Sequence, residues 1–151
     1  MLVSGDMSVA VIPKLASYAC AAALSLMGVS MAAAQQTDLQ PEIPTLKDKS
    51  GEILSNPVAG EMTIVSARIN SNATQPENFI AVVEARNSIG ITEMLEFQTG
   101  QTSGTGGVEV GISWTPEEPG SYELRTFLLS DLLEPQVLSG VSTKQITVEA
   151  K

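Results

Sequence analysis

The chain has 151 residues, with 17 acidic and 8 basic side chains, no histidine and a formal net charge of −9. This length is typical of one domain, and so acidic a surface argues against partners that need Lys and Arg, namely nucleic acid and anionic lipid. Without histidine, and with Cys20 as the single cysteine, the chain lacks the ligands of blue-copper and His-based zinc sites.

Residues 1–34 have the layout of a secretory signal peptide. Lys14 precedes an uncharged apolar run at residues 15–31, and Ala32 and Ala34 follow at the small positions that a signal peptidase requires. We therefore expect cleavage before Gln35 and a secreted or cell-surface protein with no membrane span and no thiol. A retained membrane anchor is the alternative, although the run is short for a typical span.

Two residues of the leader, Asp6 and Cys20, bear on where the leader starts and how it is processed. Asp6 is unusual in the basic region of a signal peptide, and translation from Met7 would remove it. Cys20 does not fit a lipoprotein site, because Ser17 and Tyr18 stand where an aliphatic and a small residue are needed. We therefore expect Cys20 to be lost with the leader.

Residues 35–60 are polar and interrupted by prolines, which predicts an extended N-terminal arm with short edge strands near residues 43–46 and 53–54. Such an arm could add as a strand to an exposed sheet edge of a second copy, which would make self-assembly possible. The alternative, which the sequence favours, is that the arm packs on its own domain or forms a linker. Pro41 and Pro44 each remove a backbone donor, so only one side of the arm could pair well.

Residues 61–151 alternate between apolar and polar side chains with a period of two, which predicts β-strands. Strands of this kind are expected at the following residues: 62–70, 79–87, 108–114, 122–129 and 144–150. Residues 91–97 are helix-like, but they lack helix caps and follow the turn glycine Gly90, so a further strand is expected at residues 91–98. Glycine-, serine- and proline-containing turns separate them. About seven short strands with turns at these intervals predict an all-β fold, a single antiparallel β-sandwich.

Several side chains on the expected outward faces are not typical of a solvated surface. Ile64, Ile80 and Val82 fall on these faces together with Arg68 and Arg86. Exposed apolar residues indicate a binding patch. Coverage by the N-terminal arm is the alternative.

The stretch PEEPGSYELR, residues 116–125, resembles the P-x-x-x-G-x-Y corner of immunoglobulin-like and fibronectin-like extracellular modules. The resemblance implies a structural corner in which Tyr122 folds back to bond the backbone, together with Trp114, Pro119 and Gly120. With its strands, residues 61–151 resemble small secreted Ig-like modules of the bacterial and archaeal adhesion-associated kind. Such modules are usually non-catalytic. The chain departs from antibody domains in having no disulfide pair.

No motif predicts catalysis or a cofactor. Glu117 and Glu118 are adjacent in a turn, where carboxylates splay into water and do not converge on one bond. The loop at residues 100–107 lacks the Lys-Ser/Thr of a phosphate loop and leads into a strand, which favours a hairpin. The serines have no histidine base and no nucleophile elbow. We expect no enzymatic activity.

The expected function is therefore that of an exported, non-catalytic Ig-like module that binds an unknown protein, an envelope polymer or copies of itself. The alternative is a soluble secreted carrier of a ligand or of calcium, since carboxylates abound, although no EF-hand loop occurs. Asn72 begins an Asn-Ala-Thr triplet in a polar loop and is a possible glycosylation site. A chance triplet is an equal alternative.

Overall fold

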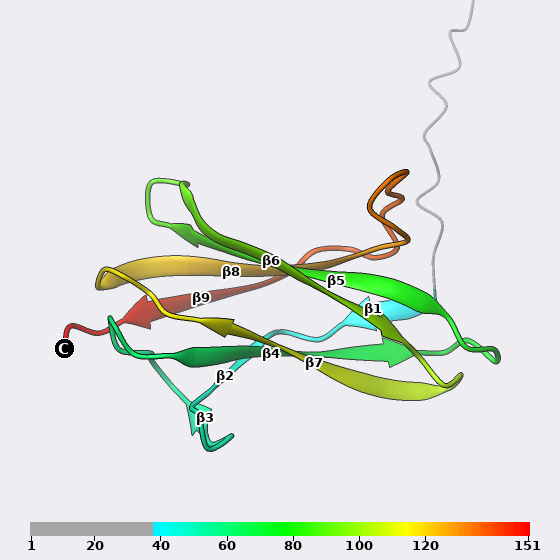
Figure 1. Cartoon of the computed structure of the whole chain (residues 1–151), viewed down its shortest axis with the longest axis horizontal. Helices are drawn as coiled ribbons and strands as arrows, with labels where there is room; N and C mark the ends of the chain where they lie inside the picture. The colour runs from blue at the N-terminus through cyan, green and yellow to red at the C-terminus, as the bar shows by residue number, and fades with distance from the viewer. Residues whose placement is uncertain (1–37) are drawn as a thin grey trace, which may run out of the picture. The chain divides into compact units, whose positions relative to one another are not determined.

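The computed structural model describes residues 38–151, and this part of the chain forms nine strands and no helix (Figure 1). The strands are β1 (Leu39–Pro41), β2 (Thr45–Lys47), β3 (Ile53–Leu54), β4 (Thr63–Ser71), β5 (Asn78–Asn87), β6 (Thr92–Gln101), β7 (Gly106–Trp114), β8 (Gly120–Leu129) and β9 (Ser142–Val148). No helix in residues 38–151 could cross a bilayer. The expected leader and its cleavage site lie outside the described residues.

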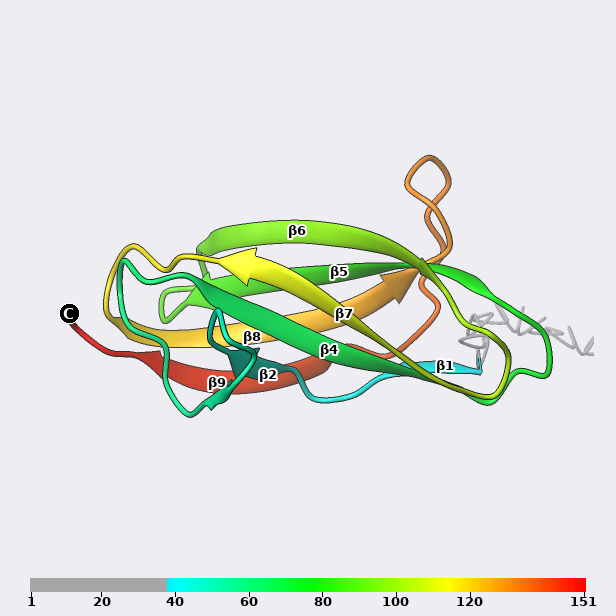
Figure 2. The same ribbon diagram turned by 60° about the horizontal axis from the view of Figure 1, so that its bottom comes forward.

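The strands form two antiparallel sheets that face each other (Figure 2). In the first, here called the β4 sheet, β4 pairs with β7 on one side and with β1 and β2 on the other, and β3 continues from β2. The second, here called the β5 sheet, has the order β6-β5-β8-β9. This arrangement confirms the expected antiparallel sandwich, including the strand expected at residues 91–98.

The segment expected as an arm contributes β1, β2 and β3. Leu39 lies opposite Ser71 and Leu46 opposite Val65 in the register with β4, and both leucines are buried. Residues 39–41 and 45–47 therefore pair within their own domain. Their backbone groups on the β4 side are not available to a second copy.

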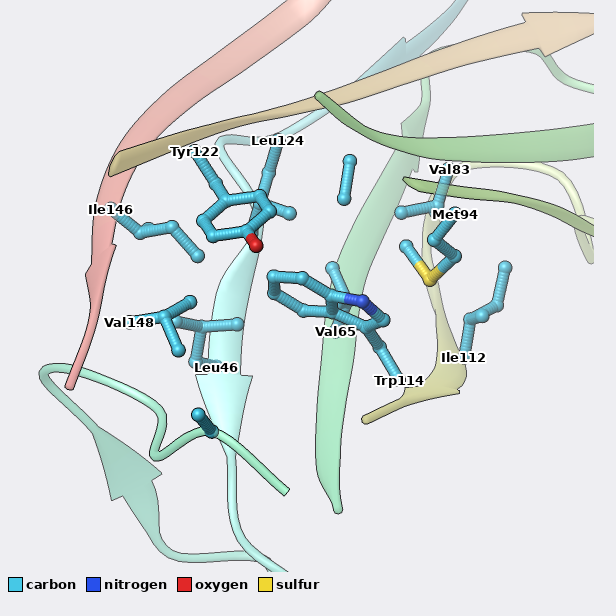
Figure 3. Close-up of a cluster of buried hydrophobic side chains, with 12 residues drawn as sticks. Leu46, Val65, Val83, Met94, Ile112, Trp114, Tyr122, Leu124, Ile146 and Val148 are labelled. Carbon is cyan, nitrogen blue, oxygen red and sulfur yellow. The ribbon is translucent and has the colours of Figure 1, made fainter. Parts of the chain in front are cut away.

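The core follows from the period-two alternation. The side chains expected to point inward from the long strands do so, and those around the Trp114–Tyr122 end of the sandwich pack as one cluster (Figure 3). This cluster includes Leu46, Val65, Val83, Met94, Ile112, Leu124, Ile146 and Val148. A second cluster surrounds Phe79 and Leu128. With no cysteine among residues 38–151, the described domain depends on this apolar burial for its stability.

Candidate interaction surface

The corner between β7 and β8 holds its two aromatic residues against the core (Figure 3). Tyr122 is 2% exposed, and its hydroxyl donates a 3.0 Å hydrogen bond to the main-chain oxygen of Glu118. The rings of Trp114 and Tyr122 meet edge to face, with centroids 5.3 Å apart. Gly120 follows Pro119 with a φ of 151°, a conformation that favours glycine. The corner therefore has a structural role, since it holds Trp114 and Tyr122 in the core.

Carboxylates surround this corner without forming a metal site. The side chains of Glu117 and Glu118 are exposed, as expected for turn residues. A hollow of about 510 Å³ beside Trp114 is lined by Glu93, Glu96 and Glu117. Within residues 38–151, however, no three Asp or Glu side chains come together in a way that could hold a metal ion.

Asn72, the possible glycosylation site, is exposed directly after β4. Its main-chain N–H donates to the carbonyl of Asp38, which anchors the backbone while the side chain remains in solvent. The position is accessible to a modifying enzyme. Whether it is modified stays a prediction.

Strand β5 is buried on both of its faces. Phe79, Ala81, Val83 and Ala85 point into the core, as expected. On the other face Ile80 and Val82 are 6% and 7% exposed. Their direct neighbours are Thr99 and Leu129 for Ile80, and Phe97 and Phe127 for Val82. Because directly opposite residues lie on the same face of a sheet, side chains of β6 and β8 cover β5. The N-terminal arm does not cover it, since that segment pairs with β4.

Glu84 occupies the same outward face and is 5% exposed. Its Oε1 accepts hydrogen bonds from Thr92 Oγ1 at 2.6 Å and Arg86 Nε at 2.7 Å, and its Oε2 accepts one from Arg125 Nη1 at 2.9 Å. Two cations and a hydroxyl thus compensate a carboxylate that is almost removed from water. Glu84 was not predicted to be a site residue, although its position inside the apolar run FIAVVEA was a signal.

The pKa of Glu84 reflects two opposed effects. Burial raises it, because burial disfavours the charged form. The hydrogen bond from Thr92, and the hydrogen bond and positive charge of Arg86 with the charge of Arg125, outweigh burial and hold the pKa below its ordinary value. Glu84 is therefore charged at neutral pH, within a charged group that lies next to the apolar residues of the same face.

The covering side chains are themselves widely exposed. Leu95, opposite Glu84, is 60% exposed, and Phe97, opposite Val82, is 52% exposed. We call the outward-facing residues of this layer the apolar face: Ile80, Val82, Leu95, Phe97, Phe127 and Leu129. An exposed apolar surface of this kind is typical of interaction sites in soluble proteins.

Two connections with apolar tips stand at the ends of the apolar face. The β5–β6 hairpin carries Ile89, which is 78% exposed, and the β8–β9 loop carries Leu133, which is 95% exposed. In Figure 1 both connections project from the β5 sheet on the side away from the β4 sheet. The apolar face is thus bordered at both ends by further exposed apolar side chains.

The corresponding face of the β4 sheet is polar. Glu109 on β7 pairs with Lys47 on β2 and accepts a hydrogen bond from Ser66 on β4. Arg68 lies near Glu42 and above Gly107, where any Cβ would meet the guanidinium group. Within the described residues, the two outer faces of the sandwich therefore differ: that of the β5 sheet carries a cluster of six apolar residues beside the charged group around Glu84, whereas that of the β4 sheet is mainly polar.

The apolar face continues to an open sheet edge. Among the described residues, β6 pairs with β5 alone, so its other side presents unpaired backbone groups. Exposed edges of this length can accept an extra strand. The opposite edge, β9, is partly covered, because Glu149 exchanges main-chain hydrogen bonds with Pro57 and Ala59.

Comparison with known proteins supports the fold. No protein-family model matches the sequence, and no curated protein matches it either. The C-terminal domain of wzt superposes with a TM-score of 0.61 at 8% identity, covering 77% of this chain and 75% of that one. The CARDB domain of PF1109 from Pyrococcus furiosus, solved in complex with di-metal ions, superposes with a TM-score of 0.55 at 14% identity. This match covers 76% of this chain and 94% of that one.

An enzyme contains a similar domain. The β-glucosidase EmGH1 from Erythrobacter marinus gives a TM-score of 0.56 at 16% identity over 74% of this chain. The match spans only 15% of the enzyme's own length. At these identities the likeness shows the fold alone, an Ig-like β-sandwich, and fold does not determine function.

The Tyr122 hydroxyl gives a stability prediction. We expect Tyr122→Phe to lower the free energy of unfolding by about 0.5–3 kcal/mol, because it leaves the Glu118 carbonyl without its donor.

Burial, helped by the nearby Glu93, raises the pKa of Tyr122 to about 12. Neutral Tyr122 thus stabilises the fold below pH 10, and this contribution is lost as pH rises to about 12. Chemical denaturation across this range measures both effects. Glu118→Gln is the control, since the acceptor belongs to the main chain; an equal loss in both variants would contradict the assignment.

Glu84 gives a second prediction. Glu84→Gln should lower the free energy of unfolding at neutral pH by about 1–3 kcal/mol, because the two arginines lose a charged acceptor. Since the folded-state pKa is lowered, the contribution is complete above the ordinary value of 4.5 and disappears as pH falls below it. The denaturation midpoints of wild type and variant should therefore converge in acid. A difference that persists unchanged at low pH would show that the charge of Glu84 is not the cause.

Proposed function

We propose that this protein is an exported, non-catalytic Ig-like module that binds another protein or an envelope polymer, or assembles with itself, through the apolar face of its β5 sheet. The observation that carries the proposal is that Leu95 and Phe97 are exposed on one strand face, next to the other apolar residues of the apolar face. Such surfaces normally exist in soluble domains because a partner covers them. The adhesion-associated kind of Ig-like module is the class that we propose.

The proposal of export rests on the leader. The apolar run at residues 15–31 and the small residues Ala32 and Ala34 predict processing before Gln35. The net charge of −9 favours solubility outside the cell and disfavours nucleic acid as a partner. Secretion or cell-surface display is the proposed localisation.

The proposal of a non-catalytic role rests on the available side chains. The chain has no histidine, and its buried acid, Glu84, is occupied by Arg86, Arg125 and Thr92. Calcium carriage has weaker support. The CARDB neighbour was solved with di-metal ions, but residues 38–151 of this chain bring no suitable group of carboxylates together.

Site-specific photo-crosslinking tests the proposed binding surface. A photoreactive phenylalanine analogue is placed at Phe97, or at Ile53 as the control. Ile53 is 74% exposed, and it lies on β3 in the other sheet. In producing cells we expect a crosslinked product from position 97 and little from position 53. Equal products from both positions, or none from position 97, would contradict this use of the apolar face.

The same sample tests export. Mass spectrometry of the exported protein should find an N-terminus near Gln35 and no thiol. A retained leader, or a lipid on Cys20, would show that the proposed processing and localisation are wrong.

A further inference from the structure

We propose that strand β6 pairs antiparallel with β6 of a second copy, with the twofold axis passing at Phe97, so that two β5 sheets join into one continuous sheet. This inference rests on the proposed function, because the same edge borders the apolar face. It differs from strand addition by residues 35–46, whose strands β1 and β2 pair with β4.

The sequence of β6 is self-complementary about Phe97. In an antiparallel pair centred there, Glu96 faces Gln98 and Leu95 faces Thr99 of the other copy. The carboxylate of Glu96 would lie opposite an amide that can donate a hydrogen bond. The two Phe97 rings would lie side by side on the apolar face, where aromatic cross-strand pairs are favourable.

Neighbouring registers lack this complementarity. A centre at Glu96 places two like charges directly opposite each other, which is destabilising. A centre at Leu95 places Phe97 opposite Glu93, and a centre at Gln98 places Leu95 opposite Gln101. Of these registers, only the one centred at Phe97 avoids such mismatches. On one face of the joined sheet it places Phe97 opposite Phe97 and Leu95 opposite Thr99, and on the other face it places Glu96 opposite Gln98.

The backbone of β6 suits this pairing. Its register with β5 is continuous from Met94 to Gln101, and the irregularity lies before Met94, where Glu93 has no partner on β5. Residues 94–100, which are symmetric about Phe97, are therefore regular strand. The bulge limits pairing beyond this stretch, since bulges interrupt an edge.

The charges of β6 are compatible with pairing in this register. Each copy carries a net charge of −9, so close approach of two copies is opposed over most of the surface. Strand β6 carries Glu93 and Glu96 and no basic residue, but in the register centred at Phe97 each acid lies opposite a glutamine, Gln101 or Gln98, and the side chains on the apolar-face side, Leu95, Phe97 and Thr99, carry no charge. The other edge of the sheet, β9, carries Lys144 and is partly covered. Lysine on an edge strand is a common barrier to pairing.

Cysteine mapping tests both the pairing and its register. In the full chain carrying Cys20→Ser, Phe97→Cys should form a disulfide-linked dimer on mild oxidation. Directly opposite residues of an antiparallel pair have Cα atoms about 4.5–5.5 Å apart, within disulfide range. Leu95→Cys alone should not form the dimer, whereas a mixture of Leu95→Cys and Thr99→Cys chains should. Thr143→Cys on β9 is the control for random collision.

Two results would overturn the inference. One is crosslinking of Leu95→Cys or Thr143→Cys alone as fast as that of Phe97→Cys. The other is a wild-type chain that sediments as a monomer at the highest concentration tested. If a dimer is found, Phe97→Lys places two like charges on the axis and should convert it to monomer. Thr143→Lys, on the opposite edge of the same sheet, should leave the dimer intact; dissociation by both variants alike would also overturn the inference.

The photo-crosslinking product at position 97 separates this inference from the proposed function. A product of twice the chain mass supports self-pairing. A product with a different partner, together with a chain that sediments as a monomer, overturns self-pairing but supports the proposed binding module. The lack of any product at position 97, with a monomeric chain, contradicts both.

Discussion

Burial of strand β5 on both faces is the constraint on which the rest of the β5 sheet depends. Ile80, Val82 and Glu84 point away from the core, yet each is less than a tenth exposed. Their cover comes from the neighbouring strands β6 and β8, so those strands must present large apolar side chains on the outside. The same burial requires Arg86 and Arg125 to compensate Glu84. The apolar face thus follows from how β5 is packed.

The other sheet shows that an Ig-like sandwich does not require such a surface. On the outer face of the β4 sheet, Ser66 lies under a polar network with Glu109 and Lys47, and Arg68 is exposed to solvent. One outer face of this domain is therefore mainly polar, and the other carries a cluster of apolar residues beside a charged group. Covering β5 does not require Leu95 and Phe97 to remain about half exposed, and the partner proposed above would account for that exposure.

Period-two alternation was sufficient to predict strands β4, β5, β7, β8 and β9 and their inward residues, because one face of each of these strands points into the core. Tyr122 in its P-x-x-x-G-x-Y context indicated the corner for a local reason, since the bonded carbonyl lies only four residues away. The apolar face was harder to predict. Alternation places Ile80 and Val82 outward correctly, but their burial depends on which strands flank β5. The pairing of Glu84 with Arg125 spans 41 residues and needs the sheet order, which a single sequence does not reveal.

The central claim is that β6 and the apolar face form the binding surface. Hydrogen exchange of the β6 backbone, measured at low and high protein concentration, tests this claim most directly. Half of the β6 amides point away from β5, and these have no backbone partner within the described part of a single copy. They should exchange rapidly in dilute protein and become protected as concentration rises, while the outward amides of β9 stay unchanged. Exchange in β6 that is independent of both protein concentration and added cell-envelope extract would contradict the account.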